Sequence, residues 1–194
     1  MKKGLTEIIY VLDRSGSMGH LTGDTIGAYN AYLDEQKNFD GETKITTVLF
    51  DDKYELMFNG AKIEDAYLDN EKYYVRGMTA LYDAVGKTIL DVGQRLSVTP
   101  ESERPEKVIF IITTDGYENA SREFTQKKVK HMINHQTKKY NWEFLFFGAN
   151  IDSVAVADTI GVCPSQAFDF EASSAGIQRM NKVCCEATAN FRNR

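Results

Sequence analysis

The sequence predicts an α/β protein with a doubly wound, mostly parallel six-stranded sheet, one antiparallel edge strand and helices on both faces. Two observations carry this prediction. Short runs of apolar residues, rich in β-branched and aromatic side chains, lack strict alternation, which is typical of parallel strands covered on both faces. Segments with helical spacing of apolar residues separate most of these runs, and this order of strands and helices indicates a doubly wound sheet.

Four apolar runs predict the central strands, and they span residues 8–12, 45–50, 108–112 and 142–147. The run at 54–58 alternates better, and it follows a short spacer made of Asp51, Asp52 and Lys53. This spacer suits a hairpin and is too short for a crossover helix, so we expect an antiparallel edge strand there. A last strand is expected near residues 167–170.

Apolar residues recur at helical spacing in the remaining segments. The strongest stripe joins Leu81, Val85, Ile89, Val92 and Leu96. The other expected helices are marked by Ile26, Tyr29 and Leu33, by residues 121–139 and 151–160, and by a stripe from Ile177 to Phe191. The stretch from Asn59 to Gly77 is the longest irregular segment, and we expect a surface excursion that carries a short helix. The role of this segment stays open.

The chain has 194 residues, with 23 Lys and Arg against 28 Asp and Glu, so its formal charge is −5. This length predicts a single domain, residues 1–194, whose core is large enough to be stable without disulfides. The acidic balance argues against a nucleic-acid partner, because phosphate binding needs clustered cations. No run of about 18 apolar residues is present, so no membrane span is expected.

Cysteine use and the start of the chain predict the compartment. Cys163, Cys184 and Cys185 cannot all pair within one chain, and a bond between the adjacent pair would close a strained ring. Reduced thiols in a reducing compartment are therefore expected. The first apolar run, residues 8–12, is too short for the centre of a signal peptide. Both features favour a cytoplasmic protein.

Carboxylates and hydroxyls follow two predicted strands and open one predicted helix. Asp13, Ser15 and Ser17 come directly after the first strand, Asp115 ends the strand at 108–112, and Thr79 precedes the strongest helical stripe. Ligands of doubly wound sheets bind beyond the carboxyl ends of strands, where the strand order reverses. Two carboxylates at that point would repel each other, and a divalent cation removes the conflict. Carboxylate and hydroxyl oxygens suit magnesium, with manganese and calcium as alternatives.

The order of these residues resembles the metal-ion-dependent adhesion site (MIDAS) of von Willebrand factor type A (vWA) domains. The matching segments are D-x-S-x-S after an apolar strand, G-x-T-x-L at the start of a helix, and an apolar strand that ends in T-D-G. The resemblance covers essentially the whole chain, points to intracellular, bacterial-type members and implies their Rossmann-like fold. It implies that Ser15, Ser17 and Thr79 bind metal through hydroxyls, and that Asp13 and Asp115 bind directly or through water. Arg14 stands at a spacer position.

The resemblance and the charge count together predict a metal-dependent protein-binding module without enzymatic activity. Two carboxylates and three neutral hydroxyls leave the cation electrophilic, with a position that an Asp or Glu of a partner protein can fill. By family analogy the partner belongs to an ATPase or stress-response complex. The sequence leaves open the partner's identity, the physiological metal and its occupancy without a partner, the oligomeric state and the pathway.

Two other functions compete with this prediction. A magnesium-dependent hydrolase or phosphotransferase could use the same cation as a Lewis acid. Against it, the sequence has no G-x-x-x-x-G-K-[S/T] loop, and no His, Cys or Lys accompanies the motif as an acid or base. An extracellular adhesin would need an export signal.

Polar residues near other strand ends have simpler interpretations. Asp51 and Asp52 suit a hairpin turn better than a place in the site. Asn150 and Asp152 follow the strand at 142–147 and are expected to cap the next helix, with a place on the rim of the site as the alternative for Asn150.

A Lys-rich helical segment and an aromatic pair leave alternatives open. His131 and His135 have the spacing of two metal ligands, but surface histidines are the expected interpretation, because Met132 stands where the zinc-peptidase pattern needs Glu. Lys127, Lys128 and Lys130 form either a solvated face or a docking surface for an acidic partner. Tyr73, Tyr74 and Met78 form either an apolar collar around the metal or an anchor for a long loop.

Overall fold

All six expected strands are present in the structure, a computed structural model that describes residues 1–194. They are β1 (Lys2–Asp13), β2 (Glu42–Phe50), β3 (Tyr54–Lys62), β4 (Pro105–Thr114), β5 (Glu143–Ala149) and β6 (Ala167–Phe170). Their order in the sheet is β3-β2-β1-β4-β5-β6, and only the pairing of β2 with β3 is antiparallel. The predicted mostly parallel sheet with one antiparallel edge strand is confirmed.

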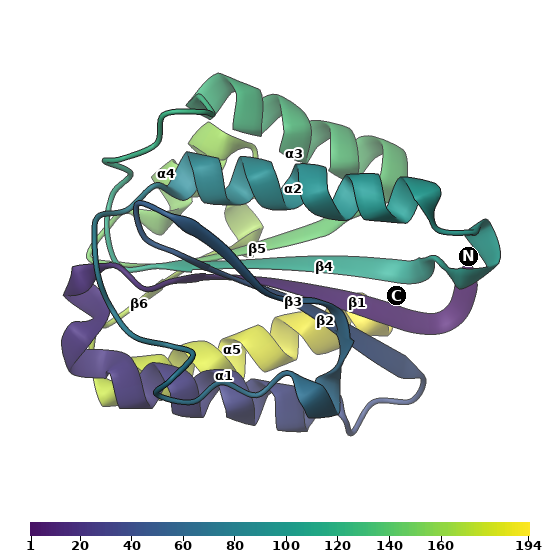
Figure 1. The fold of residues 1–194 in the computed structure, drawn as a ribbon, viewed down its shortest axis with the longest axis horizontal. Coiled ribbons are helices and arrows are strands. Elements are labelled where there is room, and N and C mark those ends of the chain that lie inside the picture. The colour runs from purple at the N-terminus through teal and green to yellow at the C-terminus, as the bar shows by residue number, and fades with distance from the viewer.

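Five α-helices cover the sheet on both faces, as predicted. They are α1 (Thr22–Gln36), α2 (Leu81–Val98), α3 (Gln126–Tyr140), α4 (Ser153–Ile160) and α5 (Ser174–Arg192). Figure 1 shows α2 and α3 above the sheet and α1 and α5 below it. None of the helices combines the length and the apolar character that a membrane span requires.

The core has two layers, one on each face of the sheet. Alternate side chains of β1 enter different layers, because successive residues of a strand point to opposite faces. Ile9 and Val11 pack in the layer that contains residues of α2, α3 and α4. Ile8 and Tyr10 pack in the layer that contains residues of α1 and α5. Burial on both faces explains why the strand sequences lack strict alternation.

The edge strand is longer than predicted. β3 continues past Phe58 to Lys62, which pairs with Lys44. Irregular pairing with β2 and Gly60, which has a φ of 62°, interrupt the alternation from which the strand was predicted. The excursion that follows carries a short 3₁₀ helix, Ile63–Asp65, and no α-helix.

The boundaries of α3 and α4 follow from their caps. α3 begins at Gln126, later than the predicted 121, and the Thr125 side chain accepts a hydrogen bond from the Lys128 amide. The backbone just before it is held by Asp83, whose carboxylate accepts the amide hydrogens of residues 122–124. At α4 the predicted cap is confirmed for Asp152, whose side chain accepts from the Ala155 amide, while Asn150 lies before the cap with a φ of 58°.

The strand order reverses between β1 and β4. The chain leaves β1 for its neighbour β2 on one side and later returns to β4 on the other side. The two strands run parallel with Leu12 beside Thr113, so the residues that follow them emerge at the same edge of the sheet. This is the position at which doubly wound sheets bind ligands.

Candidate metal site

The loop after β1 is organised around the Asp13 carboxylate. The Ser15 amide donates to Asp13 Oδ1 at 2.6 Å, and the Thr114 hydroxyl donates to Asp13 Oδ2 at 2.7 Å. Ser15 is followed by a 3₁₀ helix, Gly16–Leu21, and Ser17 is the second residue of this helix. The hydrogen bond from Thr114 ties the end of β4 to the end of β1.

The two serine hydroxyls face the Asp115 carboxylate. Ser17 Oγ donates to Asp115 Oδ1 at 2.6 Å, and Ser15 Oγ donates to the same oxygen at 3.4 Å. The two hydroxyl oxygens lie 3.2 Å apart. A Cβ atom at Gly116 would lie 3.9 Å from Thr79 Oγ1, so the Thr79 hydroxyl borders the same loop. The structure thus brings all five predicted residues to one edge of the sheet.

The carboxylates of this site lack a cationic partner. Neither Asp13 nor Asp115 forms an ion pair with a Lys, Arg or His side chain. Burial raises the pKa of Asp13 to about 6, hydrogen bonds from Ser15 and Thr114 act in the opposite direction, and the Asp115 charge adds to the rise. Buried charges need a partner. Because the donors are carboxylate and hydroxyl oxygens, the residues present fit a hard divalent cation.

Asn119, which the sequence analysis did not select, fixes Thr79 in place. Its side-chain oxygen accepts the Thr79 backbone amide hydrogen at 2.9 Å, and its backbone amide donates to the Thr79 carbonyl at 2.9 Å. Glu118 accepts the Tyr82 amide hydrogen at 3.0 Å and so ties the same loop to the start of α2. No spacing in the sequence links these residues, because they lie about 40 positions from their partners.

Asp51 forms the predicted hairpin turn and has a second role. Its Oδ1 accepts the Lys53 amide hydrogen at 2.7 Å, which is the expected turn contact. The residue is also fully buried, and its Oδ2 binds the guanidinium groups of Arg14 and Arg76. Arg14, predicted to be a spacer, is buried as well. The turn residue therefore contacts the loop that carries the candidate metal ligands.

Of the three residues before Thr79 whose role was left open, one anchors the loop. Tyr73 is buried and donates its hydroxyl hydrogen to the Asp13 carbonyl at 2.9 Å, so it anchors the loop. Tyr74 and Met78 are 44% and 52% exposed, and the Tyr74 ring lies against the guanidinium groups of Arg14 and Arg76.

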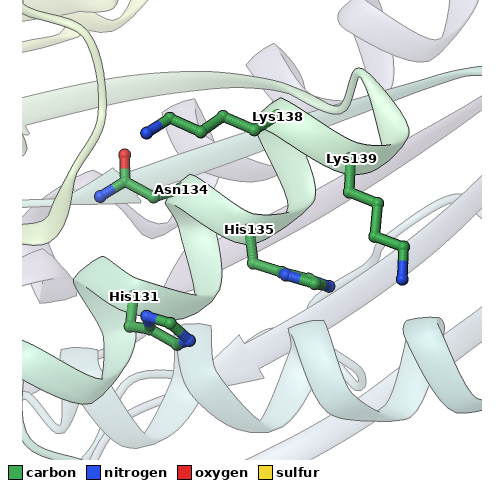
Figure 2. Close-up of a pocket in the computed structure, with 5 residues that line it drawn as sticks. All are labelled: His131, Asn134, His135, Lys138 and Lys139. Atoms are coloured by element: carbon green, nitrogen blue, oxygen red, sulfur yellow. The ribbon is translucent and has the colours of Figure 1, made fainter.

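The basic helix α3 forms a separate, open surface. Figure 2 shows His131, Asn134, His135, Lys138 and Lys139 along its outer side, where they line a shallow pocket of about 480 Å³. Both histidines are exposed, as expected of surface residues. No three His, Cys, Asp or Glu side chains of the chain gather to hold a metal ion, so the pair has no third ligand of these types.

Known structures share the fold of this chain. The mussel byssus proximal thread matrix protein 1 with a zinc-occupied MIDAS motif aligns at a TM-score of 0.63 and 18% identity, over 94% of this chain and 46% of that one. The ArnB paralog VWA2 from Sulfolobus acidocaldarius aligns at 0.58 and 17%, over 96% and 45%. The PilB minor pilin from Streptococcus sanguinis aligns at 0.67 and 10%, over 97% and 62%.

These comparisons define the fold class. No protein-family model matches the chain, and no curated protein matches it by sequence. The chain spans less than two thirds of the length of each structure named above. At identities of 10–18% the likeness concerns the fold alone. The chain has the Rossmann-like α/β fold of vWA domains.

Proposed function

We propose that this chain is a metal-dependent protein-binding module with an intact MIDAS. The observation that carries the proposal is the pair of buried carboxylates, Asp13 and Asp115, which have hydroxyl and amide donors around them and no Lys, Arg or His side chain as an ion-pair partner. Such a charge arrangement is costly unless an external cation joins it. Ser15, Ser17 and Thr79 would complete the oxygen shell on the protein side.

Magnesium is the proposed cation, and manganese and calcium are the alternatives. All three take oxygen ligands, whereas softer metals prefer nitrogen or sulfur. The zinc reported in the MIDAS motif of the mussel protein supports a divalent cation in general. The bound ion would supply positive charge at the sheet edge. The protein side chains would hold it in place and leave one position for an Asp or Glu of the partner.

A non-enzymatic role in the cytoplasm completes the proposal. No His, Cys or Lys side chain hydrogen-bonds to the five residues, so none of these common acids and bases is aligned with them. Cys163 is an exposed free thiol, which suits a reducing compartment. Cys184 is buried in the core, as its helical spacing predicts. A partner within an ATPase or stress-response complex is proposed from the family resemblance.

Metal binding is tested first with the isolated chain. Titration calorimetry and thermal melting with magnesium, manganese, calcium and zinc should show binding that EDTA reverses. Asp13→Ala and Asp115→Ala should abolish it, while Lys182→Ala, an exposed change on α5, should not. Wild-type protein that binds none of these cations would contradict the metal site.

Partner binding is tested next with the immobilised chain and a lysate of the source cell. Proteins retained with magnesium should be lost with EDTA and absent from the Asp115→Ala column. Replacement of each Asp and Glu of a retained protein should then identify the residue that binds the metal. Retention that ignores both EDTA and Asp115→Ala would contradict a partner-completed site.

A further inference from the structure

We propose that Arg14 and Asp51 form a positioning pair that holds the two metal-binding loops together and thereby sets the affinity for the cation. This inference rests on the metal site proposed above. Arg14 lies between the candidate ligands Asp13 and Ser15, and Asp51 lies in the β2–β3 turn, outside the motif.

Arg14 links three segments of the chain through its side chain and its backbone. The side chain is fully buried, with Nε 3.1 Å from Asp51 Oδ2 and Nη2 2.6 Å from Glu55 Oε2. The Arg14 amide donates to the Phe50 carbonyl at 2.8 Å, and its carbonyl accepts from the Arg76 amide at 2.9 Å. The loop after β1 is therefore bound to the β2–β3 turn and to the segment before Thr79.

Asp51 carries the connection on to the second metal loop. Its Oδ2 accepts from Arg76 Nε at 2.7 Å, and its carbonyl accepts the Ala80 amide hydrogen at 2.9 Å. Ala80 directly follows the candidate ligand Thr79. Asp51 thus contacts Arg14, next to Asp13, with its side chain, and Ala80, next to Thr79, with its backbone carbonyl.

The two loops also meet directly at glycines. The Gly16 amide donates to the Gly77 carbonyl at 3.3 Å. Gly77 has a φ of 66°, and a Cβ atom there would lie 1.9 Å from Asp52 Oδ1 and 3.3 Å from Asp51 Cβ. No side chain fits between Gly77 and the β2–β3 turn, so the loop before Thr79 packs directly against this turn.

The charges of the pair indicate a role beyond filling space. Buried ion pairs are often replaceable by apolar residues without loss of stability, so they are poor evidence for a purely stabilising function. Neither Arg14 Nη1 nor Nη2 has a hydrogen-bond partner of good geometry although both are buried, and only Nη2 has a carboxylate close by, which adds to the cost of keeping a guanidinium there. Groups that orient metal ligands from behind commonly change metal affinity by about 10–100-fold. Asp51 acts one residue further out, because it binds Arg14 and Ala80, the chain neighbours of Asp13 and Thr79, and it also neutralises guanidinium charge near the expected cation.

The test compares magnesium affinity with stability in the whole chain. Asp51→Asn and Arg14→Met should weaken magnesium binding by about 10–100-fold in titration calorimetry. Arg14→Lys should recover part of the affinity lost in Arg14→Met, because its ammonium can still pair with Asp51. The double variant Arg14→Met/Asp51→Asn should lose less affinity than the two single losses added together, since both changes remove the same Arg14–Asp51 contact.

Glu7→Gln is the matched control. Glu7 is 1% exposed and pairs with Arg95, so its replacement breaks another buried ion pair on the same strand, away from the loops. It should lower stability in urea unfolding with EDTA and leave magnesium affinity within about twofold of wild type. The inference would be overturned if Asp51→Asn and both Arg14 variants fold and bind magnesium like wild type. Equal loss of affinity in Glu7→Gln would overturn it too. Wild-type protein without magnesium binding would instead refute the proposed function on which the inference rests.

Discussion

Strand β1 carries two buried carboxylates on the same face of the sheet, and their surroundings differ. Glu7 is 1% exposed and Asp13 is 0% exposed, with Ile9 and Val11 of one core layer between them. Glu7 forms an ion pair with Arg95 and accepts the Thr46 hydroxyl hydrogen at 2.7 Å. Asp13 accepts only hydroxyl and amide hydrogens.

The difference shows how a buried carboxylate that can bind a ligand is told apart from one that only supports the fold. Burial is equal at the two positions, so burial alone identifies neither as functional. The chain supplies a cation for Glu7 and none for Asp13 or Asp115, and this missing charge is what an external divalent ion can provide. Each experiment below tests whether that contrast governs stability and metal binding.

Neutralising Glu7 and Asp13 in turn should have the largest effects on the free energy of unfolding, and the two effects should differ most from each other. Glu7→Gln should lower the free energy of unfolding by about 2 kcal/mol, because Arg95 loses its charged partner. Asp13→Asn in EDTA should stay within about 1 kcal/mol of wild type, because the change removes an unpaired buried charge and keeps the shape. Urea unfolding without metal measures both.

Magnesium should reverse the ranking of these two variants. At a free concentration of about 100 times Kd, it should add about 2.7 kcal/mol to wild type and to Glu7→Gln, and nothing to Asp13→Asn. Equal stabilisation of both variants by magnesium would show that the Asp13 carboxylate, although it has no cationic side chain as a partner, is irrelevant to metal binding.

Gly77→Ala should have the next largest effect, confined to the loops of the site. A φ of 66° costs a non-glycine residue about 1–2 kcal/mol, and the new methyl group would displace Asp52. We expect that loss in urea unfolding, together with weaker magnesium binding. Gly27→Ala is the control, because Gly27 lies in α1 with no atom near its added Cβ. It should raise stability by about 0.5–1 kcal/mol and leave magnesium binding unchanged.

The sequence alone was sufficient to predict the sheet and to select the five candidate ligands. Parallel strands emerge at one edge, so residues that follow β1 and β4 can be brought together without knowledge of any contact. The order of Asp13, Ser15, Ser17, Thr79 and Asp115 then suggested a metal site, and the structure places them side by side.

The supporting contacts could not be predicted, because they join residues that are distant in sequence and chemically ordinary. Arg14 meets Asp51 across 37 positions, and Arg95 meets Glu7 across 88. The predicted start of α3 was wrong for a similar reason. The backbone before the helix is held by Asp83, which lies about 40 positions away in the sequence. Local propensity contains no information about such partners.

Tyr73→Phe should produce a smaller loss of stability, because it acts on the backbone of Asp13 and not on its carboxylate. The change removes the hydrogen bond to the Asp13 carbonyl and should cost about 1 kcal/mol in urea unfolding. Magnesium affinity should fall as well, because the backbone of a ligand loses its anchor. Tyr29→Phe is the matched control, since this buried hydroxyl binds Thr47 and the Ala66 carbonyl away from the site. A similar stability loss with unchanged magnesium affinity is expected there.

The smallest effect is expected at charges that are neither buried nor paired. Lys138 on α3 is exposed and forms no ion pair with a carboxylate. Lys138→Gln should change the free energy of unfolding by less than about 0.5 kcal/mol, because water solvates the ammonium in the folded and unfolded chain alike. Magnesium binding should also be unaffected. A loss above about 1 kcal/mol would show that an exposed, unpaired charge can stabilise this fold about as much as the buried ion pair of Glu7 does. The comparison of Glu7 with Asp13 could then not be explained by their burial.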